Sequence, residues 1–254
     1  MALHRFFTDG PMPSSEDLAG AGVVLPLSEG DIHHLRDVLR LDSGDEIILA
    51  GGGRAERVKL TAVGERVVGR GLGPLQSSVL PRVTLVQGLA KGEKMDDIVR
   101  HTTELGVARI IPLDAERSVV RLTPAKATAR VERWRRIAAE AAKQAQRVDV
   151  PTVRALAAIE DLPAMLAGSV VLVCWEDADD APGISEALGP DLDDESDVAV
   201  IVGPEGGLTE HEVRILAAMG ATVVTLGPTV LRTETAGLVA TALVIHERGG
   251  LGAR

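Results

Sequence analysis

Residues 198–208 read VAVIVGPEGGL, and residues 222–236 read TVVTLGPTVLRTETA. Each stretch opens with β-branched and other apolar residues, the pattern of a buried parallel strand. Each apolar run then ends at Gly-Pro, which terminates a strand and exposes backbone N–H groups. The two stretches therefore predict two strands that end in tight glycine loops.

Residues 209–219, which lie between these stretches, carry the pattern of a helix. Thr209 is suited to cap its start, a glutamate follows, and apolar residues recur at helical spacing. Two adjacent strands joined in this way place both loops at the carboxyl edge of a parallel sheet, where open α/β folds bind ligands. We therefore expect a ligand site at this edge.

Two familiar loop motifs do not fit the sequence. GPEGG lacks the G-x-G-x-x-G spacing of a dinucleotide site, and no G-K-[ST] follows as in a P-loop. A single Gly-Pro after a strand usually marks only a turn. A pair of such loops, with Glu205, Arg232 and Glu234 just beyond the strand ends, indicates more.

The paired loop motifs resemble those of the SPOUT methyltransferases, and specifically of the RsmE type. Further similar segments cover nearly the whole chain: residues 33–45, with His33-His34-Leu35 and Val38-Leu39-Arg40, residues 85–107 (LVQGLAKGEKMDDIVRHTTELGV), residues 116–120 (ERSVV) and residues 133–147 (RWRRIAAEAAKQAQR). One segment departs from the family pattern. Where the family commonly has a run like Gln-Ser-Gly-Arg, this chain has Gln144-Ala145-Gln146-Arg147.

The resemblance implies an α/β fold with a parallel sheet and a C-terminal trefoil knot, preceded by a small PUA-like β-barrel that binds RNA. It also implies a homodimer. The expected methyl donor is S-adenosylmethionine. The expected acceptor is N3 of a uridine in 16S rRNA, within the small ribosomal subunit.

Methylation of uridine N3 sets chemical requirements for the site. The N3 proton must leave, and negative charge then develops on the flanking carbonyl oxygens, so a base and a cation are needed. We assign Arg232 to the uracil anion or its phosphate, and Glu205 or Glu234 to proton removal. Leu231 beside Arg232 indicates that this segment packs. Glu234 has an alternative role at the helix dipole, because Thr233-Glu234 opens a helix.

The remaining candidate residues fall into two groups. The cofactor is expected against Trp175, Glu176, Gly203, Pro204, Gly206, Leu226, Gly227, Leu231, Thr235 and Ala236. RNA contacts are expected from His33, His34, Arg36, Arg40, Arg117, Arg133, Arg136 and Arg147. The arginines of the basic helix have an alternative interpretation as a solvated face, although Arg suits bidentate phosphate contacts.

The chain is expected to divide near residues 71–81, GLGPLQSSVLP, a Gly-, Pro- and Ser-containing stretch without charged side chains that is typical of a linker. We take residues 1–73 as the RNA-binding β-barrel domain and residues 74–254 as the methyltransferase domain. Strands are predicted before the linker at residues 46–50, 57–63 and 67–71, with a hairpin turn at Gly51-Gly52-Gly53 and a helix at residues 31–41. After it, strands at 82–87, 108–112, 170–175, 198–202 and 222–226 alternate with helices at 96–105, 130–147 and 234–248.

Composition favours a cytoplasmic globular enzyme. Apolar residues make up 45% of the chain, and no run approaches the length of a membrane span or a signal peptide. The single Cys174 excludes an intrachain disulfide and a multi-cysteine zinc site, and no metal is expected.

The net charge of −10 is unevenly spread, since residues 74–160 carry 15 basic and 10 acidic side chains. The net positive charge of this middle part could attract RNA phosphates although the whole protein is acidic.

Three other interpretations stay open. The chain could be a non-catalytic RNA-binding or ribosome-assembly module on a methyltransferase scaffold. It could transfer the methyl group to a ribose 2′-OH, or it could be a nucleotide-binding oxidoreductase. The intact loop motifs argue against the first interpretation, and the missing dinucleotide fingerprint argues against the last.

Overall fold

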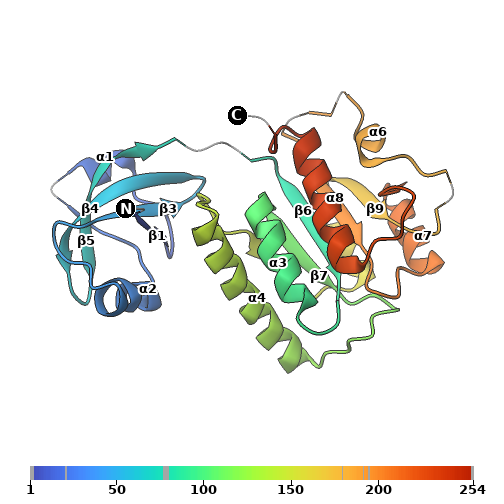
Figure 1. Ribbon diagram of the computed structural model, residues 1–254, viewed down its shortest axis with the longest axis horizontal. Coiled ribbons are helices and arrows are strands. Elements are labelled where there is room, and N and C mark those ends of the chain that lie inside the picture. The colour runs from blue at the N-terminus through green and yellow to red at the C-terminus, as the bar shows by residue number, and fades with distance from the viewer. Residues whose placement is uncertain are drawn as a thin grey trace. The chain divides into compact units, whose positions relative to one another are not determined.

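A computed structural model describes residues 3–20, 22–76, 80–178, 180–190, 192–193 and 195–252 (Figure 1). The chain forms two compact units. The first comprises Met1–Val79 and Ala142–Val150, and the second comprises Leu80–Ala141 and Pro151–Arg254. The division thus falls beyond residue 73, and the first unit also takes a segment from the middle of the chain.

The described part of the first unit is built on a five-stranded sheet in the order β1-β3-β4-β5-β2. Its elements are β1 (His4–Phe7), α1 (Ser15–Ala19), β2 (Val23–Val24), α2 (Glu29–His33), η1 (His34–Val38), β3 (Glu46–Gly51), β4 (Arg54–Val63) and β5 (Val67–Leu75). The predicted hairpin is confirmed, because β3 and β4 are antiparallel and joined by Gly52 and Gly53, at φ of 59° and 77°. Positive φ at both positions is what a two-residue turn of the right twist requires.

Two predictions in this unit need correction. Residues 71–75 of the expected linker belong to β5, where they pair with β4 in a register that includes Ala55↔Leu75; the rest of the linker includes residues 77–79, which lie outside the described residues. Hydrogen bonds to β4 continue β5 through residues 71–75, where the Gly- and Pro-rich sequence predicts the end of the strand. The helix expected at residues 31–41 is shorter, an α-helix that continues as the π-helix η1.

Ala142–Val150 is tied to the first unit by polar contacts. The Arg5 guanidinium donates to the Arg147 carbonyl at 2.9 Å, and the Lys143 ammonium lies 3.0 Å from an Asp31 carboxylate oxygen. Gln146, at the place of a glycine in the resembled Gln-Ser-Gly-Arg run, has φ of 55°. A left-handed residue after a helix is usually glycine, so Gln146 holds a strained backbone here.

The second unit contains a six-stranded sheet in the order β11-β9-β10-β6-β7-β8, and all its pairings are parallel. The strands are β6 (Val83–Gly88), β7 (Arg109–Leu113), β8 (Thr152–Val153), β9 (Val170–Cys174), β10 (Val198–Val202) and β11 (Thr222–Val224). Every residue of β6 and β10 is buried, as continuous apolar strands covered on both faces should be. The predicted parallel α/β sheet is confirmed.

Helices cover both faces of this sheet. On one face α3 (Lys94–Leu105) packs against α8 (Thr233–Glu247), which also contacts β6 and β10, and α4 (Pro124–Gln144) runs beside α3 (Figure 1). The other face packs against α7 (Glu210–Ala218), η2 (Ile159–Asp161) and α5 (Leu162–Met165); α6 (Ile184–Leu188) lies beside α8. Two predicted helix signals are confirmed: Thr209 caps α7 in a capping box with Glu212, and Gly106 ends α3 at φ of 116°.

Asp96 links α3 to α4. Its carboxylate accepts from the Arg133 guanidinium at 2.6 and 2.9 Å and from the Trp134 indole N–H at 3.0 Å. Trp134 is fully buried, so its N–H depends on this acceptor. The two helices are therefore held together by a polar contact inside an apolar interface.

We expect Asp96→Ala to lower the free energy of unfolding by about 2 kcal/mol, because it leaves the Trp134 N–H buried without a partner. Asp97→Ala is the matched control, since Asp97 is exposed and its one ion pair among the described residues is with Arg100 on the same helix; it should cost less than about 0.5 kcal/mol. Urea unfolding followed by tryptophan fluorescence reports this unit, because both tryptophans, Trp134 and Trp175, lie in it. Equal effects of the two variants would contradict the role of Asp96.

In the described part of the chain, no helix is long and apolar enough to cross a membrane. The same residues contain no cluster of three or more His, Cys, Asp or Glu side chains arranged to hold a metal ion.

Candidate active site

A cavity of about 510 Å³ lies in the second unit, where β9, β10 and β11 end. This is the carboxyl edge at which the sequence places a ligand site. Eight of the ten residues predicted to contact the cofactor line it: Trp175, Glu176, Gly203, Pro204, Leu226, Gly227, Leu231 and Ala236. Two of the three predicted catalytic residues, Glu205 and Arg232, line it as well.

Gly206 and Thr235 are not part of the cavity lining. A Cβ atom on Gly206 would lie 2.9 Å from the Arg117 carbonyl oxygen and 3.0 Å from the Arg117 Cβ atom. Gly206 therefore allows close packing against the segment around Arg117, and its contact with the cofactor stays a prediction. Thr235 is exposed on the first turn of α8, where the sequence could not distinguish its direction from that of Ala236.

A buried chain of hydrogen bonds fixes the walls of the cavity. The Gln87 side-chain amide donates to the Thr233 hydroxyl at 2.8 Å, and that hydroxyl donates to the Gly203 carbonyl at 2.5 Å. At Gly88 the backbone passes so close to the 203–208 loop that a Cβ atom would lie 2.3 Å from the Pro204 nitrogen. The end of β6, the glycine loop after β10 and the start of α8 thus form one rigid wall.

The lining fits S-adenosylmethionine, the cofactor that the resemblance implies. The Trp175 indole nitrogen is inaccessible to solvent and has no hydrogen-bond partner among the described residues. The protein itself closes off this nitrogen, so a ligand would contact it only after the indole ring moved, and the fit of the cofactor rests on the rest of the lining. Apolar residues such as Leu226, Leu231 and Ala236 line the cavity beside this donor, as in pockets for adenine-containing ligands.

The rim of the cavity carries a group of three charges that the sequence analysis did not bring together. The Lys94 ammonium, at the first residue of α3, lies 3.1 Å from a Glu205 carboxylate oxygen and 3.1 Å from a Glu234 carboxylate oxygen. Glu205 also accepts from the Lys91 backbone N–H at 3.0 Å. Lys94 lines the cavity. Glu234 is not part of the lining and is connected to it by the ion pair with Lys94.

These contacts set the protonation of the three groups. Burial raises the pKa of Glu205 and Glu234, but hydrogen bonds from backbone N–H groups and the close contact of each carboxylate with Lys94 outweigh it, so both values lie below the ordinary glutamate pKa. The contacts with Glu234 and Glu205 raise the pKa of Lys94 above its usual value. All three groups are therefore charged at neutral pH. The sequence signal for Lys94 was only its place in the segment KGEKMDD, which resembles the family.

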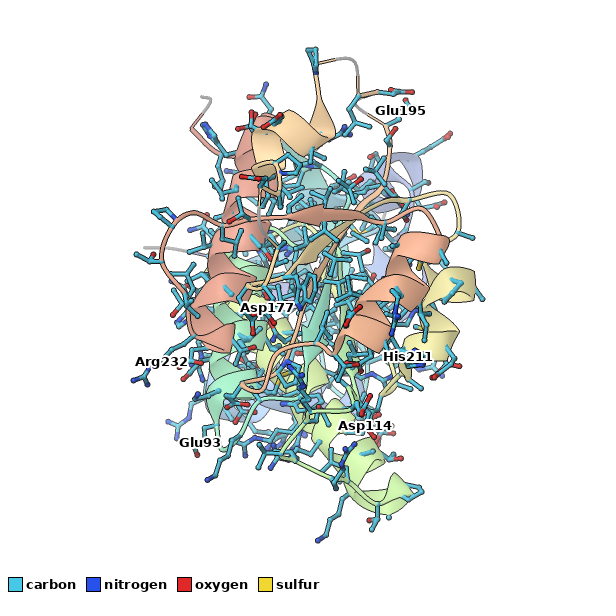
Figure 2. All side chains as sticks on the ribbon, turned by 90° about the vertical axis from the view of Figure 1, so that its right-hand side faces the viewer. Glu93, Asp114, Asp177, Glu195, His211 and Arg232 are labelled. Atoms are coloured by element: carbon cyan, nitrogen blue, oxygen red, sulfur yellow. The ribbon has the colours of Figure 1, made fainter. Side chains whose placement is uncertain are left out.

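Arg232 is the N-cap residue of α8, with a side chain that makes no hydrogen bond to the cap. The residue is exposed, and Figure 2 shows its side chain extending outward at the edge of the molecule. Among the described residues its guanidinium has no hydrogen-bond or ion-pair partner within contact distance. The expected packing of this segment therefore does not hold the guanidinium, which faces solvent beside the cavity.

Cys174, at the end of β9, lines the cavity. It is only partly buried by surrounding residues, and burial raises the pKa of its thiol to about 12. The thiol is therefore protonated at neutral pH and is unsuited to act as a nucleophile.

The predicted RNA contacts differ in their surroundings. His33, His34, Arg36 and Arg40 are exposed in the first unit, where His33 and Arg36 both bind the Asp37 carboxylate, at 2.6 and 2.7 Å. Arg40 has φ of 55°, a strained conformation of the kind found at functional sites. The charge available to RNA is thus smaller than the count of basic residues indicates.

The other predicted RNA contacts lie on α4 and the segments around it. Arg117, Arg133 and Arg136 are exposed, although Arg133 is engaged by Asp96. Arg147 is the exception: it is only 7% exposed and its guanidinium lies 3.1 Å from Asp149. Among these residues Arg147 has the least support as an RNA contact, because little of its side chain is accessible to a phosphate.

A parallel sheet with a glycine-walled cavity at its carboxyl edge and a charged rim is the architecture of a ligand-binding α/β enzyme. The chain belongs to the RNA methyltransferase family, whose domain model matches residues 77–245.

Its relatives narrow this class. It is 35% identical to the ribosomal RNA small subunit methyltransferase E of Bacillus subtilis over 224 residues, which cover 85% of this chain and 88% of the relative. It is 32% identical to the protein of the same name from Mycobacterium bovis over 241 residues, covering 90% and 88%. The crystal structure of a ribosomal RNA small subunit methyltransferase E from Neisseria gonorrhoeae bound to S-adenosyl methionine has a TM-score of 0.78 at 30% identity, covering 96% of this chain and 97% of that one.

Proposed function

We propose that the protein transfers a methyl group from S-adenosylmethionine to N3 of a uridine in 16S rRNA of the small ribosomal subunit. The observation that carries this proposal is the cavity at the ends of β9, β10 and β11, lined by eight of the predicted cofactor residues and rimmed by Lys94, Glu205 and Arg232. The relatives named as small subunit rRNA methyltransferases support the substrate class. The choice of N3 follows from the resemblance to the RsmE type.

The residues of this chain have distinct parts in the proposed reaction. The bound donor supplies an electrophilic methyl group. The wall formed by Gly203, Trp175 and Leu226 would hold the donor, and positioning of donor and acceptor in line supplies much of the rate. The solvent-facing guanidinium of Arg232 suits a phosphate of the RNA, which it can bind through two parallel hydrogen bonds. The two rim glutamates are the candidates for proton removal that the sequence provides.

The proposal is tested by incubating the protein with labelled methyl donor and with small subunits, or 16S rRNA, that lack the modification, followed by nucleoside mass spectrometry. N3-methyluridine is the expected product. A 2′-O-methylated nucleoside would reassign the acceptor, and binding of the donor without transfer to any RNA would favour a non-catalytic assembly factor.

We also propose that the first unit is a PUA-like RNA-binding barrel and that the second is the SPOUT methyltransferase domain with a trefoil knot. The short, mostly antiparallel strands of the first unit support the barrel. The knot is supported by the path of the last segment: Thr233, after the edge strand β11, donates to Gly203 in the loop after β10, and α8 then packs on β6 and β10. Passage of the chain end through a loop would give this arrangement.

A truncated protein that begins at Leu80 tests this division of labour. It should bind S-adenosylmethionine with nearly unchanged affinity, because the described cavity residues all follow Leu80, and it should methylate rRNA poorly. Calorimetry and methyl-transfer assays measure the two properties. The truncation also removes Asp31, the partner of Lys143, so the matched control is Lys143→Ala in the full-length protein, which should keep its activity. Full activity of the truncated protein would refute the division.

The proposed quaternary structure is a homodimer, and the proposed location is the cytoplasm, where small subunits are assembled. Helix α8 supports the dimer because apolar side chains continue around it: Leu243 is exposed, and Leu238, Val239 and Ala242 are only partly buried. A helix with apolar residues on all sides is usually covered on all sides.

A further inference from the structure

Lys94 has no part in the proposed reaction as its roles were assigned from sequence. Its ammonium is held between carboxylates from two other segments, Glu205 after β10 and Glu234 on α8, at 3.1 Å from each. The side chain is 32% exposed and lines the cavity, so a ligand can reach it. An ion pair that served only to join the three segments would not need to face the cavity.

The two glutamates are poorly suited to remove the N3 proton. Glu205 accepts hydrogen bonds from Lys91 N–H and from Lys94, and Glu234 is paired with Lys94. Hydrogen bonds to the ionised form make a carboxylate a weaker base. A general base works best when its pKa lies near the working pH, and these contacts move both glutamates in the opposite direction.

The geometry points to Lys94 as the cation that faces the uracil ring during methyl transfer, with Glu205 and Glu234 as positioning residues that hold its ammonium. This inference rests on the proposed uridine N3 acceptor. Lys94 stabilises the imide anion formed when N3 loses its proton to solvent water. The N3 electron pair then forms the bond to the methyl carbon, while the carbon–sulfur bond breaks and its electron pair stays on sulfur.

The electrostatic surroundings of Lys94 keep it charged over the useful pH range. The charged groups in contact with it are Glu205 from the loop after β10 and Glu234 on α8, each at 3.1 Å. Glu176 and Arg232 line the same cavity, Lys91 and Glu93 precede Lys94 in the chain, and the Arg130 guanidinium on α4 donates to the Gly92 carbonyl. The nearest two are the carboxylates, which favour the ammonium form. Any pH dependence near and above neutrality should therefore come from the uracil imide.

The test compares wild type, Lys94→Met and Lys94→Arg in single-turnover methyl transfer at saturating cofactor, from about pH 6 to about pH 9.5. Wild type should speed up tenfold per pH unit until the bound imide is ionised. A cation within reach lowers the pKa of an acidic group by about 1–3 units, so Lys94→Met should be about tenfold or more slower at neutral pH and should approach wild type at high pH. Lys94→Arg keeps the charge and should resemble wild type.

A second measurement does not depend on turnover. Once the target uridine has been located with wild type, an RNA with 5-fluorouridine at that position is bound together with S-adenosylhomocysteine, and its ¹⁹F chemical shift is titrated. The imide should ionise about one pH unit or more lower on wild type than on Lys94→Met. Cofactor affinity, measured by calorimetry, should be similar in both, which shows that the cavity is intact.

The inference fails in identifiable ways. A Lys94→Met rate that is lowered equally at every pH, or an unchanged imide titration, assigns Lys94 a structural role only. A wild-type rate that is flat across this pH range, with Glu205→Gln or Glu234→Gln inactive throughout, makes a glutamate the base. In both cases N3-methyluridine from wild type leaves the proposed function standing, whereas a different product nucleoside overturns the function and this inference together.

Discussion

Arg232→Ala should lower the rate of single-turnover methyl transfer by about a hundredfold, because a substrate held even slightly out of line loses a factor of this size. The affinity for S-adenosylmethionine should change far less, since Arg232 lies at the rim of the cavity and its exposed side chain extends outward (Figure 2). Arg232→Lys should recover little of the rate, because a point charge replaces a planar fork that matches a phosphate. Transfer assays and calorimetry on both variants measure the two properties.

Arg214→Ala is the matched control for Arg232. Arg214 lies on α7, its side chain is 69% exposed and its nearest carboxylate, Glu210, is 3.8 Å away, so both arginines are surface cations of the second unit. Only Arg232 borders the cavity. The proposed role would be wrong if Arg232→Ala transferred methyl at nearly the wild-type rate, if it lost only cofactor binding, or if Arg214→Ala had the same effect.

Gly227→Val should weaken cofactor binding by about tenfold or more. Gly227 lines the cavity with φ of 115°, and a β-branched residue in such a backbone costs about 1–3 kcal/mol unless the loop rearranges. A Cβ atom there would meet nothing within 4 Å among the described residues, so the substitution causes no collision with the described part of the protein. Calorimetric titration with S-adenosylmethionine measures the loss.

Gly220→Val separates loop strain from loss of stability. Gly220 follows α7 with φ of 93°, and a Cβ atom on it would likewise have open space among the described residues, but it does not line the cavity. Both variants should lower the thermal midpoint by a similar amount, because both force the same kind of backbone strain. Only Gly227→Val should lose cofactor affinity; a similar loss in Gly220→Val would show that the effect reflects stability and not the cavity.

The strands and the site edge could be predicted from local sequence. Buried parallel strands need continuous apolar runs, and Val198–Val202, an apolar run followed by Gly-Pro, was predicted with its observed bounds. Gly-Pro is not a sufficient stop signal by itself, because Gly73-Pro74 lies inside β5. The same signals placed Trp175, Gly203, Leu226 and Gly227 at one cavity, because the carboxyl ends of neighbouring parallel strands meet at one edge.

Other features depend on contacts that sequence spacing does not encode. The close approach of Gly206 to Arg117 is set by packing between segments far apart in the chain. The low exposure of Arg147 likewise depends on which segments pack around it, and helix periodicity does not show this. A basic residue on a helix is exposed by default, and only tertiary packing reverses that expectation.

The sequence by itself determined a parallel α/β sheet and the edge at which its ligand site lies, because strand periodicity and glycine turns act over a few residues. Only the tertiary structure decided which charges meet at that edge. Lys94, Glu205 and Glu234 come from three separate segments, and their ion pairs at 3.1 Å exist only once α3 and α8 pack together on the sheet. Electrostatic roles depend on such distances, because the interaction between two charges weakens as they separate and as solvent enters between them.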